Sequence, residues 1–187
     1  MAVRHIPERE RKTAHTSCME PSWELRFSKA QVMALAGRLH HDEDGIKALV
    51  TRMTATCDPR VAYNAAWVLS HLSKEDKRMY LLPHYEELVD FSTSESLCLR
   101  RGLALSILAN LPANEPSGKL LNFCLTCLAD PKERDSSRAM MIKLAANMCK
   151  PYPELRKELA LHLSMIPQES SPSITAAKRK ALQIIQQ

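Results

Sequence analysis

The sequence predicts an all-α fold, a short right-handed α-α superhelix of about four helix pairs. Three observations support this prediction. Apolar residues recur at helical spacing along most of the 187 residues. Only 4 glycines occur and β-branched runs are few, which disfavours a sheet protein. Segments of similar pattern return after steps of 39 and 37 residues, the spacing expected of stacked helix pairs.

The clearest predicted helix is the segment 58–72. Asp58 is a good N-cap because its carboxylate accepts hydrogen bonds from N–H groups of the first turn, and Pro59 suits the first helical position. Apolar residues then fall at i, i+4, i+7, i+8 and i+11, the stripe of a half-buried helix. They are Val61, Ala65, Val68, Leu69 and Leu72. We expect Leu69 to be buried between paired helices.

The pattern of this helix recurs downstream. Shifts of 39 and then 37 residues bring three apolar positions into register, first Ala65, Leu69 and Leu72, then Ala104, Leu108 and Leu111, then Met141, Ala145 and Met148. A further step of 37 residues gives a partial match at Lys178, Leu182 and Ile185. The Asp-Pro-x-Val start, followed by Ala and two Leu at these offsets, resembles the second helix of a HEAT repeat. The resemblance covers about residues 43–150 and implies a HEAT-like solenoid.

Residues 1–27 carry two prolines and many charges without a sustained period, so we expect a flexible arm able to dock through Trp23, Leu25 and Phe27. Residues 28–187 are expected to form the HEAT-like repeat domain. Ser28 would cap a helix over 29–40. After the polar loop 40–45, a helix with Ile46, Leu49, Val50 and Met53 on its apolar face would pair with the helix 58–72.

The later helices are delimited by caps and prolines. Ser73, with Asp76 three residues on, would cap a helix reaching about Phe91, and Pro83 should kink it near Leu82 because proline removes a backbone donor. Its partner is expected over 95–111, ending at Pro112. Four further helices are expected, over 117–129, 130–149, 155–166 and 174–186. Pro116 precedes the first of them, and the second begins at Asp130-Pro131 with Glu133 at the capping-box position. The last, basic helix would cap the stack.

Composition narrows the class of protein. Apolar content of 45% with 25% charged residues is ordinary for a soluble globular chain. No apolar run of 18 residues occurs and the first twelve residues lack a secretory signal, so we expect a cytoplasmic protein without membrane contact. The net charge of +5 lies in residues 132–187, with ten Lys and Arg against five Asp and Glu. This asymmetry permits an anionic partner, nucleic acid included, but does not require one.

No sequence motif of catalysis, phosphate binding or calcium binding is present, so we expect no catalytic residue and no cofactor. The Cys124–Cys127 CxxC lacks a second ligand pair, and both thiols are expected to be buried rather than to bind zinc. The polar residues of the loop 40–44 could bind a metal only if their side chains converged, and an ordinary loop between helices explains them equally. They are His40, His41, Asp42, Glu43 and Asp44. We therefore expect no metal site.

Two pairs of residues are candidates for binding. Tyr63 and Trp67 lie one helical turn apart, off the apolar stripe. They could fill space between repeats, where the equivalent residues are small, or form an aromatic hot spot on the concave surface. Arg101 and Arg138 stand where the resemblance places an arginine that ladders to aspartates. The equivalent residue in the first repeat is Ala62, so the ladder is broken, and a structural role is favoured over ligand contact.

Three polar residues share one register of the repeat, His71, Asn110 and Asn147. In the related armadillo repeats, asparagines of the inner helix hold the backbone of an extended peptide, which implies a binding ladder here. An amide suits this task because it has both donors and an acceptor, and His71 offers the same only when neutral. The alternative is that these residues cap helix ends, since Pro112 and Pro151 follow closely.

The resemblance implies a non-enzymatic scaffold that binds a protein or peptide on the concave face of its second helices. The alternative is a DNA-binding or DNA-repair protein, because some bacterial alkylpurine DNA glycosylases consist of HEAT-like repeats and hold DNA on a basic concave face. Those enzymes rely on tryptophans and an aspartate late in the chain. This chain has only Trp23 and Trp67, both early, and no catalytic residue is transferred to it.

Overall fold

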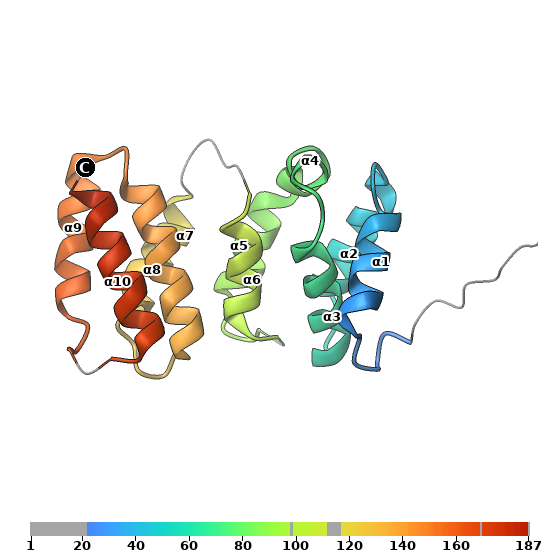
Figure 1. Cartoon of the computed structure of the whole chain (residues 1–187), viewed down its shortest axis with the longest axis horizontal. Coiled ribbons are helices and arrows are strands. Elements are labelled where there is room, and N and C mark those ends of the chain that lie inside the picture. Colours follow the sequence, from blue (N-terminus) through green and yellow to red (C-terminus); the bar gives the residue numbers. More distant parts are fainter. Residues whose placement is uncertain (1–21, 98, 112–116, 169, 187) are drawn as a thin grey trace, which may run out of the picture.

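The computed structural model describes residues 22–97, 99–111, 117–168 and 170–186, which form helices joined by turns without a strand among them. The helices follow one another along the long axis in chain order, from α1 at one end to α9 and α10 at the other (Figure 1). The predicted all-α solenoid is confirmed. Within these described ranges, no helix is both long and apolar enough to span a membrane.

The helices have the following bounds. Ordered along the chain, they are α1 Lys29–Arg38, α2 Glu43–Thr54, α3 Pro59–Ser70, α4 Lys74–Asp76, the π-helix η1 Lys77–Leu81, the 3-10 helix η2 Leu82–His84, α5 Tyr85–Thr93, α6 Arg101–Leu108, α7 Gly118–Cys127, α8 Asp135–Cys149, α9 Pro153–Ser164 and α10 Pro172–Ile185.

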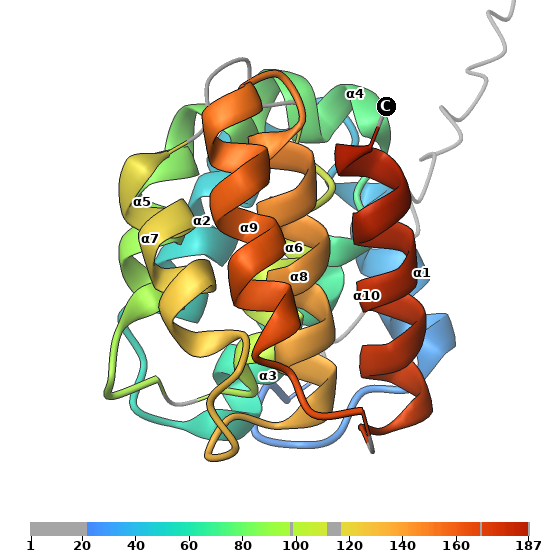
Figure 2. The same cartoon turned by 90° about the vertical axis from the view of Figure 1, so that its left-hand side faces the viewer.

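Contacts between the helices define two rows. Four pairs are formed by α2 with α3, α5 with α6, α7 with α8, and α9 with α10. The helices α1, α3, α6, α8 and α10 contact one another in succession, and we call them the second-helix row. The remaining helices cover the other side of the stack (Figure 2). They are α2, α4, η1, η2, α5, α7 and α9. The C-terminal α10 contacts α8 along this row and so ends the stack, as predicted.

The predicted repeat register places the core correctly. Leu69 is fully buried, and its equivalents Leu108 and Ala145 are buried too. The helix α3 begins at the cap that the sequence indicated: the Asp58 carboxylate accepts hydrogen bonds from the backbone N–H of Arg60 and of Val61, at 2.7 and 3.2 Å. The Leu69 position therefore lies at the hydrophobic centre of the first helix pair.

The first helix of the second pair is interrupted where proline was expected to interrupt it. Ser73 accepts a hydrogen bond from the Asp76 backbone N–H at 3.0 Å and starts α4. The helix then widens into η1 and tightens into η2, which contains Pro83, before α5 continues. The missing N–H of proline accounts for this change of helical geometry.

Two predicted helix starts are wrong. The helix expected from about residue 95 begins at Arg101, because the preceding backbone turns and offers its Ser92 and Ser94 carbonyls to the Arg101 guanidinium. The helix expected from Asp130-Pro131 begins at Asp135. The Asp130 carboxylate does accept from a nearby backbone N–H, that of Lys132 at 2.8 Å, but it closes a turn rather than a helix. The stop and start predicted at Pro112 and Pro116 lie outside the described residues.

Residues 22–27 contact the middle of α3. The Asn64 amide donates to the carbonyls of Trp23 and Leu25, at 2.8 and 2.7 Å, and its oxygen accepts from the Phe27 N–H at 3.5 Å. Phe27 is buried and Trp23 half-buried, whereas the Leu25 side chain is 67% exposed and does not join the contact expected of it. Residues 1–21 lie outside the described residues, so the division at 27/28 stays a prediction.

Candidate functional site

Charge is segregated between the two rows of helices. The five helices of the second-helix row contain a single acidic residue, Asp135, against nine basic residues. The helices of the other side hold nine acidic and eight basic residues. Because successive second helices lie side by side, the stacking collects positive charge that is scattered along the sequence.

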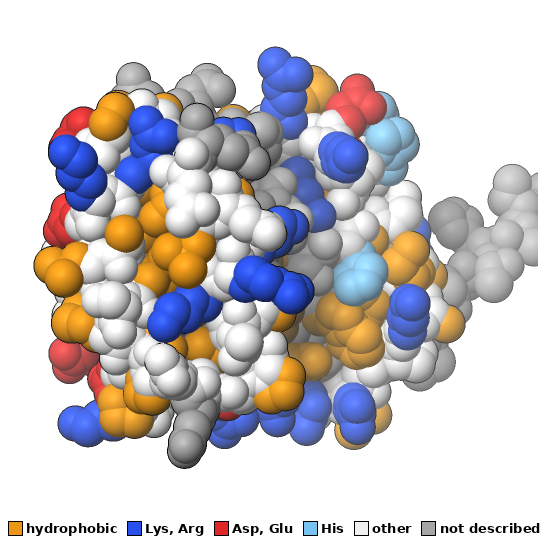
Figure 3. Space-filling view, turned by 60° about the vertical axis from the view of Figure 1, so that its left-hand side comes forward, with side chains coloured by type: hydrophobic (Ala, Val, Ile, Leu, Met, Phe, Trp, Pro, Cys, Tyr) orange, Lys and Arg blue, Asp and Glu red, His pale blue; other side chains and the backbone are white. Residues whose placement is uncertain are grey.

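Most of this positive charge faces solvent. Of the nine basic residues, six are exposed: Lys29, Arg38, Arg60, Lys143, Arg179 and Lys180. On the face shown in Figure 3, Lys and Arg side chains occur across the middle, and Asp and Glu lie mainly toward the edges. Such a distribution attracts anionic partners and raises their rate of association.

An aromatic column runs along α3 at the start of the row. The Tyr63 and Trp67 ring centroids are 5.9 Å apart, and those of Trp67 and His71 are 6.3 Å apart. All three side chains are half-buried. His71 Nδ1 lies 3.0 Å from both the Trp67 carbonyl oxygen and the Ser70 hydroxyl oxygen. With its proton on Nδ1, the neutral ring presents Nε2 as an acceptor. The three rings thus contact one another along α3 and remain partly accessible to solvent.

The three residues of the predicted polar ladder have different surroundings. His71 is the C-cap of α3. Asn110 is exposed, and its amide nitrogen donates to the Ser106 carbonyl at 2.6 Å. Asn147 is exposed on α8. Two of the three therefore bond to carbonyls of their own helix ends, as the capping alternative expects, while a role in ligand binding stays a prediction.

Arg101 and Arg138 are held by the chain itself. Arg101 donates to the Glu133 carboxylate at 2.8 Å and to the carbonyls of Ser92 and Ser94, and its guanidinium lies 4.9 Å from the Phe123 ring centroid. The buried Arg138 donates to the Leu128 carbonyl at 3.0 Å. Both guanidinium groups thus join neighbouring segments of the solenoid, and a ligand would have to displace these bonds.

Sequence reasoning missed a basic cleft beside the aromatic column. A cavity of 530 Å³ is lined by Arg26, Arg60 and Arg100 together with Tyr63 and Asp58. Asp58 Oδ1 accepts hydrogen bonds from the first turn of α3, and the cleft is lined by three positive charges and this one negative charge. The three arginines come from separate segments, and no local signal connects them. Guanidinium groups pair with carboxylate or phosphate in a bidentate way, so the cleft suits an anionic group.

A model of the HEAT repeat domain family matches residues 20–185 of this chain. The protein belongs to the HEAT repeat family. The match extends beyond residues 43–150, over which the sequence pattern showed the resemblance, and includes the segment 22–27 and the last helix pair. No curated protein and no solved structure matches the chain significantly.

Of the four cysteines that the structure of this HEAT repeat protein describes, two are enclosed by the core. Cys124 and Cys149 are buried, and burial raises the pKa of both thiols, that of Cys149 to about 11. Cys127 was expected to be inaccessible but is half-buried, because it is the last residue of α7 and lies near the charged Glu133 and Arg101. Cys57 is exposed.

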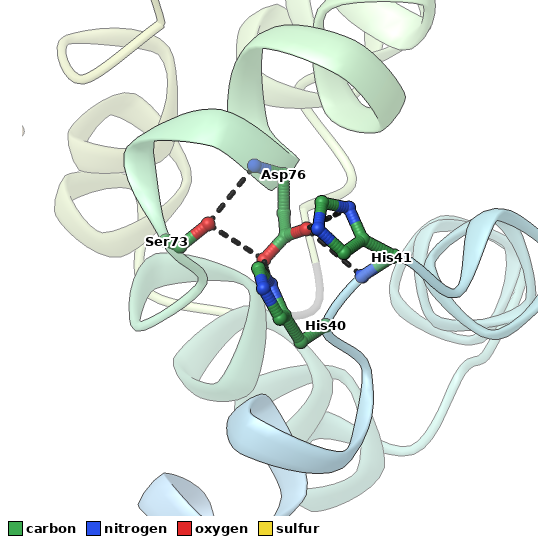
Figure 4. Close-up of polar contacts among 4 residues, drawn as sticks. All are labelled: His40, His41, Ser73 and Asp76. Carbon is green, nitrogen blue, oxygen red and sulfur yellow. Dashed lines mark hydrogen bonds and ion pairs between the residues drawn. The ribbon is translucent and has the colours of Figure 1, made fainter.

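A polar cluster joins the first two helix pairs of the HEAT stack (Figure 4). His40 Nδ1 lies 3.1 Å from Asp76 Oδ2, and His41 Nδ1 lies 3.9 Å from Asp76 Oδ1. Burial opposes ionisation of Asp76, but hydrogen bonds from Ser73, the His41 backbone and His40 outweigh it and lower the pKa of Asp76 to about 2. The carboxylate is therefore ionised at neutral pH.

The membership of this cluster differs from that considered in the sequence. Only the two histidines of the loop 40–44 converge, and their common partner is Asp76 of α4. Asp42 instead caps α2 by accepting from the Gly45 N–H at 2.9 Å, and Glu43 and Asp44 are exposed. The sequence indicated Asp76 only as a helix-capping residue, because nothing local connects it with the loop.

Proposed function

We propose that this HEAT repeat protein is a non-enzymatic scaffold that binds an acidic segment of a partner protein along its second-helix row. The segregation of charge carries the proposal, with nine basic residues and one acidic residue in that row. An acidic chain laid across the row meets complementary charge at several successive helices. Such complementarity sets specificity and speeds association.

The aromatic column supplies the anchor that charge alone lacks. Tyr, Trp and Arg are the side chains most enriched among binding hot spots. Tyr63 and Trp67 contact each other, so their rings lose little conformational freedom when a ligand covers them. The adjoining cleft places Arg26, Arg60 and Arg100 where a carboxylate of the same segment would be paired.

The repeat register extends this site along the stack. The positions equivalent to Trp67 are Ser106, Lys143 and Lys180, so the row changes from aromatic through hydroxyl to basic. Asn110 uses one N–H on Ser106 and keeps a second N–H and its oxygen for a peptide group. Asn147 is exposed and His71 keeps Nε2, so the ladder remains part of the proposal.

Charge reversal on the two rows tests the proposal. Peptides displayed on phage would be selected against the wild-type protein, and the enriched peptides would be measured by fluorescence anisotropy. The test variant is Lys143→Glu/Lys180→Glu on the second-helix row. The matched control is Lys47→Glu/Lys157→Glu, which changes the same charge at exposed positions of α2 and α9.

We expect the enriched peptides to be acidic, and to lose at least about tenfold in affinity to the test variant and little to the control. Trp67→Ala should weaken the same peptides by roughly 2 kcal/mol, the size of a hot-spot effect. Selection without acidic enrichment, or equal losses in both charge variants, would refute binding along this row.

Nucleic acid is the second candidate ligand, and the same basic row favours it. Phosphate binding releases condensed counterions, so its affinity falls steeply as salt rises. Duplex DNA titrated at several salt concentrations separates the two candidates. Micromolar binding with a logarithmic slope of several units, lost in Lys143→Glu/Lys180→Glu, would replace the acidic peptide as the ligand. Absence of binding at low salt excludes DNA.

A further inference from the structure

The cluster of His40, His41 and Asp76 has the composition of a transition-metal site. Its three potential ligand atoms all lie within 4.8 Å of one another. Both histidine rings are about half exposed, at 52% and 51%, whereas the carboxylate is 1% exposed. A fixed, ionised oxygen ligand thus faces two rings that are free to adjust (Figure 4).

The backbone turns both rings toward the same carboxylate. Consecutive side chains of an extended chain point in opposite directions. His41 instead has φ of 58°, the left-handed region that residues other than glycine seldom enter. Its N–H donates to Asp76 Oδ1 at 3.1 Å, and the two imidazole centroids lie only 3.9 Å apart. This turn brings two adjacent nitrogen ligands to one side of the loop.

An ion bound by Asp76 would replace the hydrogen bond between Asp76 and the His40 ring. Oδ2 accepts from the Ser73 hydroxyl at 2.6 Å, and its other lone pair faces His40 Nδ1. Oδ1 accepts from the His41 N–H and keeps one lone pair toward the His41 ring. Ser73 thereby orients the carboxylate from behind, as the hydrogen-bonded supports of metal ligands do.

We propose that His40, His41 and Asp76 bind one divalent transition-metal ion of the Zn²⁺, Ni²⁺ or Co²⁺ class. Nitrogen and oxygen ligands lie about 2.0–2.2 Å from zinc, so two ligands of one tetrahedral ion are roughly 3.3 Å apart. The His40–Asp76 distance of 3.1 Å fits this, and rotation of the exposed His41 ring closes its 3.9 Å.

Imidazole nitrogens favour transition metals over Mg²⁺ and Ca²⁺, which prefer oxygen ligands. Three protein ligands leave the fourth position for water or for a group from a binding partner. The ion would tie the loop between α1 and α2 to α4, across the boundary between the first two helix pairs. It would therefore stabilise the N-terminal end of the stack against unfolding.

Calorimetric titration of the tag-free, metal-free full chain with ZnCl₂ tests this site. The test variant is His40→Gln/His41→Asn, because Gln and Asn retain hydrogen bonding and Asn tolerates the left-handed backbone of residue 41. The control variant is His84→Gln/His162→Gln, which removes two histidines elsewhere. Circular dichroism of the metal-free proteins establishes that each variant is folded, and His40→Gln alone replaces the double variant if it is not.

We expect one Zn²⁺ per chain and a metal-induced rise in Tm for the wild type and the control. The test variant should bind at least about tenfold more weakly, the loss that follows from removing even the supports of metal ligands. Co²⁺ spectra then identify the ligands, since thiolate produces intense charge-transfer absorption and imidazole with carboxylate does not. No saturable binding, unchanged binding in the test variant, or a thiolate spectrum would overturn the proposal.

Discussion

Replacing Leu69 by alanine measures whether the repeat register organises the core. Leu69 is fully buried between α3 and its neighbours, and its truncation removes apolar contacts and leaves a cavity that a rigid stack refills only in part. Truncations of this kind cost about 2–5 kcal/mol. For a domain of this size each kcal/mol shifts Tm by about 2–4 °C, so a cost near 3 kcal/mol predicts a fall of roughly 10 °C.

Urea unfolding followed by two probes is the assay. Circular dichroism reports all helices, whereas fluorescence reports Trp23 and Trp67, which both lie at the first helix pair. Neighbouring repeats stabilise one another only through shared interfaces. Leu69→Ala should therefore move the fluorescence midpoint at least as far as the circular dichroism midpoint. The matched control is Leu161→Ala on α9, because that side chain is 65% exposed.

The control should change stability by less than about 0.5 kcal/mol, as surface substitutions usually do. If Leu69→Ala costs less than about 1 kcal/mol, or no more than Leu161→Ala, the core does not depend on this register. A fluorescence midpoint that stays in place while the circular dichroism midpoint falls would show that Leu69 stabilises a different part of the stack.

Asn64→Ala should destabilise the chain by about 1–3 kcal/mol and speed proteolysis within residues 22–27, because it leaves the carbonyls of Trp23 and Leu25 without their donor; limited trypsin digestion read by mass spectrometry checks this. Arg101→Met should cost about 2–4 kcal/mol in urea unfolding, since it deprives Glu133 and two backbone carbonyls of a charged donor, whereas Arg100→Met should cost little. At pH 8 a thiol reagent should label Cys57 at least about tenfold faster than Cys124, because burial raises the pKa of Cys124 and only the thiolate reacts. Peptide mapping of the labelled protein measures the two rates, and equal rates would contradict the enclosed position of Cys124.

Local chemistry was sufficient to predict most elements of the fold. The caps Ser28, Asp58 and Ser73 act within three residues of themselves, so a reader of the sequence can recognise them. The apolar period that buries Leu69 is likewise a property of one helix, and its recurrence reveals the stack. The predicted first residues of α6 and α8 were wrong. Near these starts, Arg101 and Glu133 bond to each other across 32 residues, and no pattern within one helix indicates such a bond.

The sequence by itself thus determined the helices, their order and their buried faces, because a helix follows from interactions between residues three or four apart. Only the tertiary structure decided which charges and ligands meet. It brings Asp76 to His40 and His41 across 36 and 35 residues, and it assembles Arg26, Arg60 and Arg100 around one cleft. It also gathers the basic second helices on one side of the stack. These groupings depend on how rigid helices are placed by core packing, and no short-range pattern records that placement.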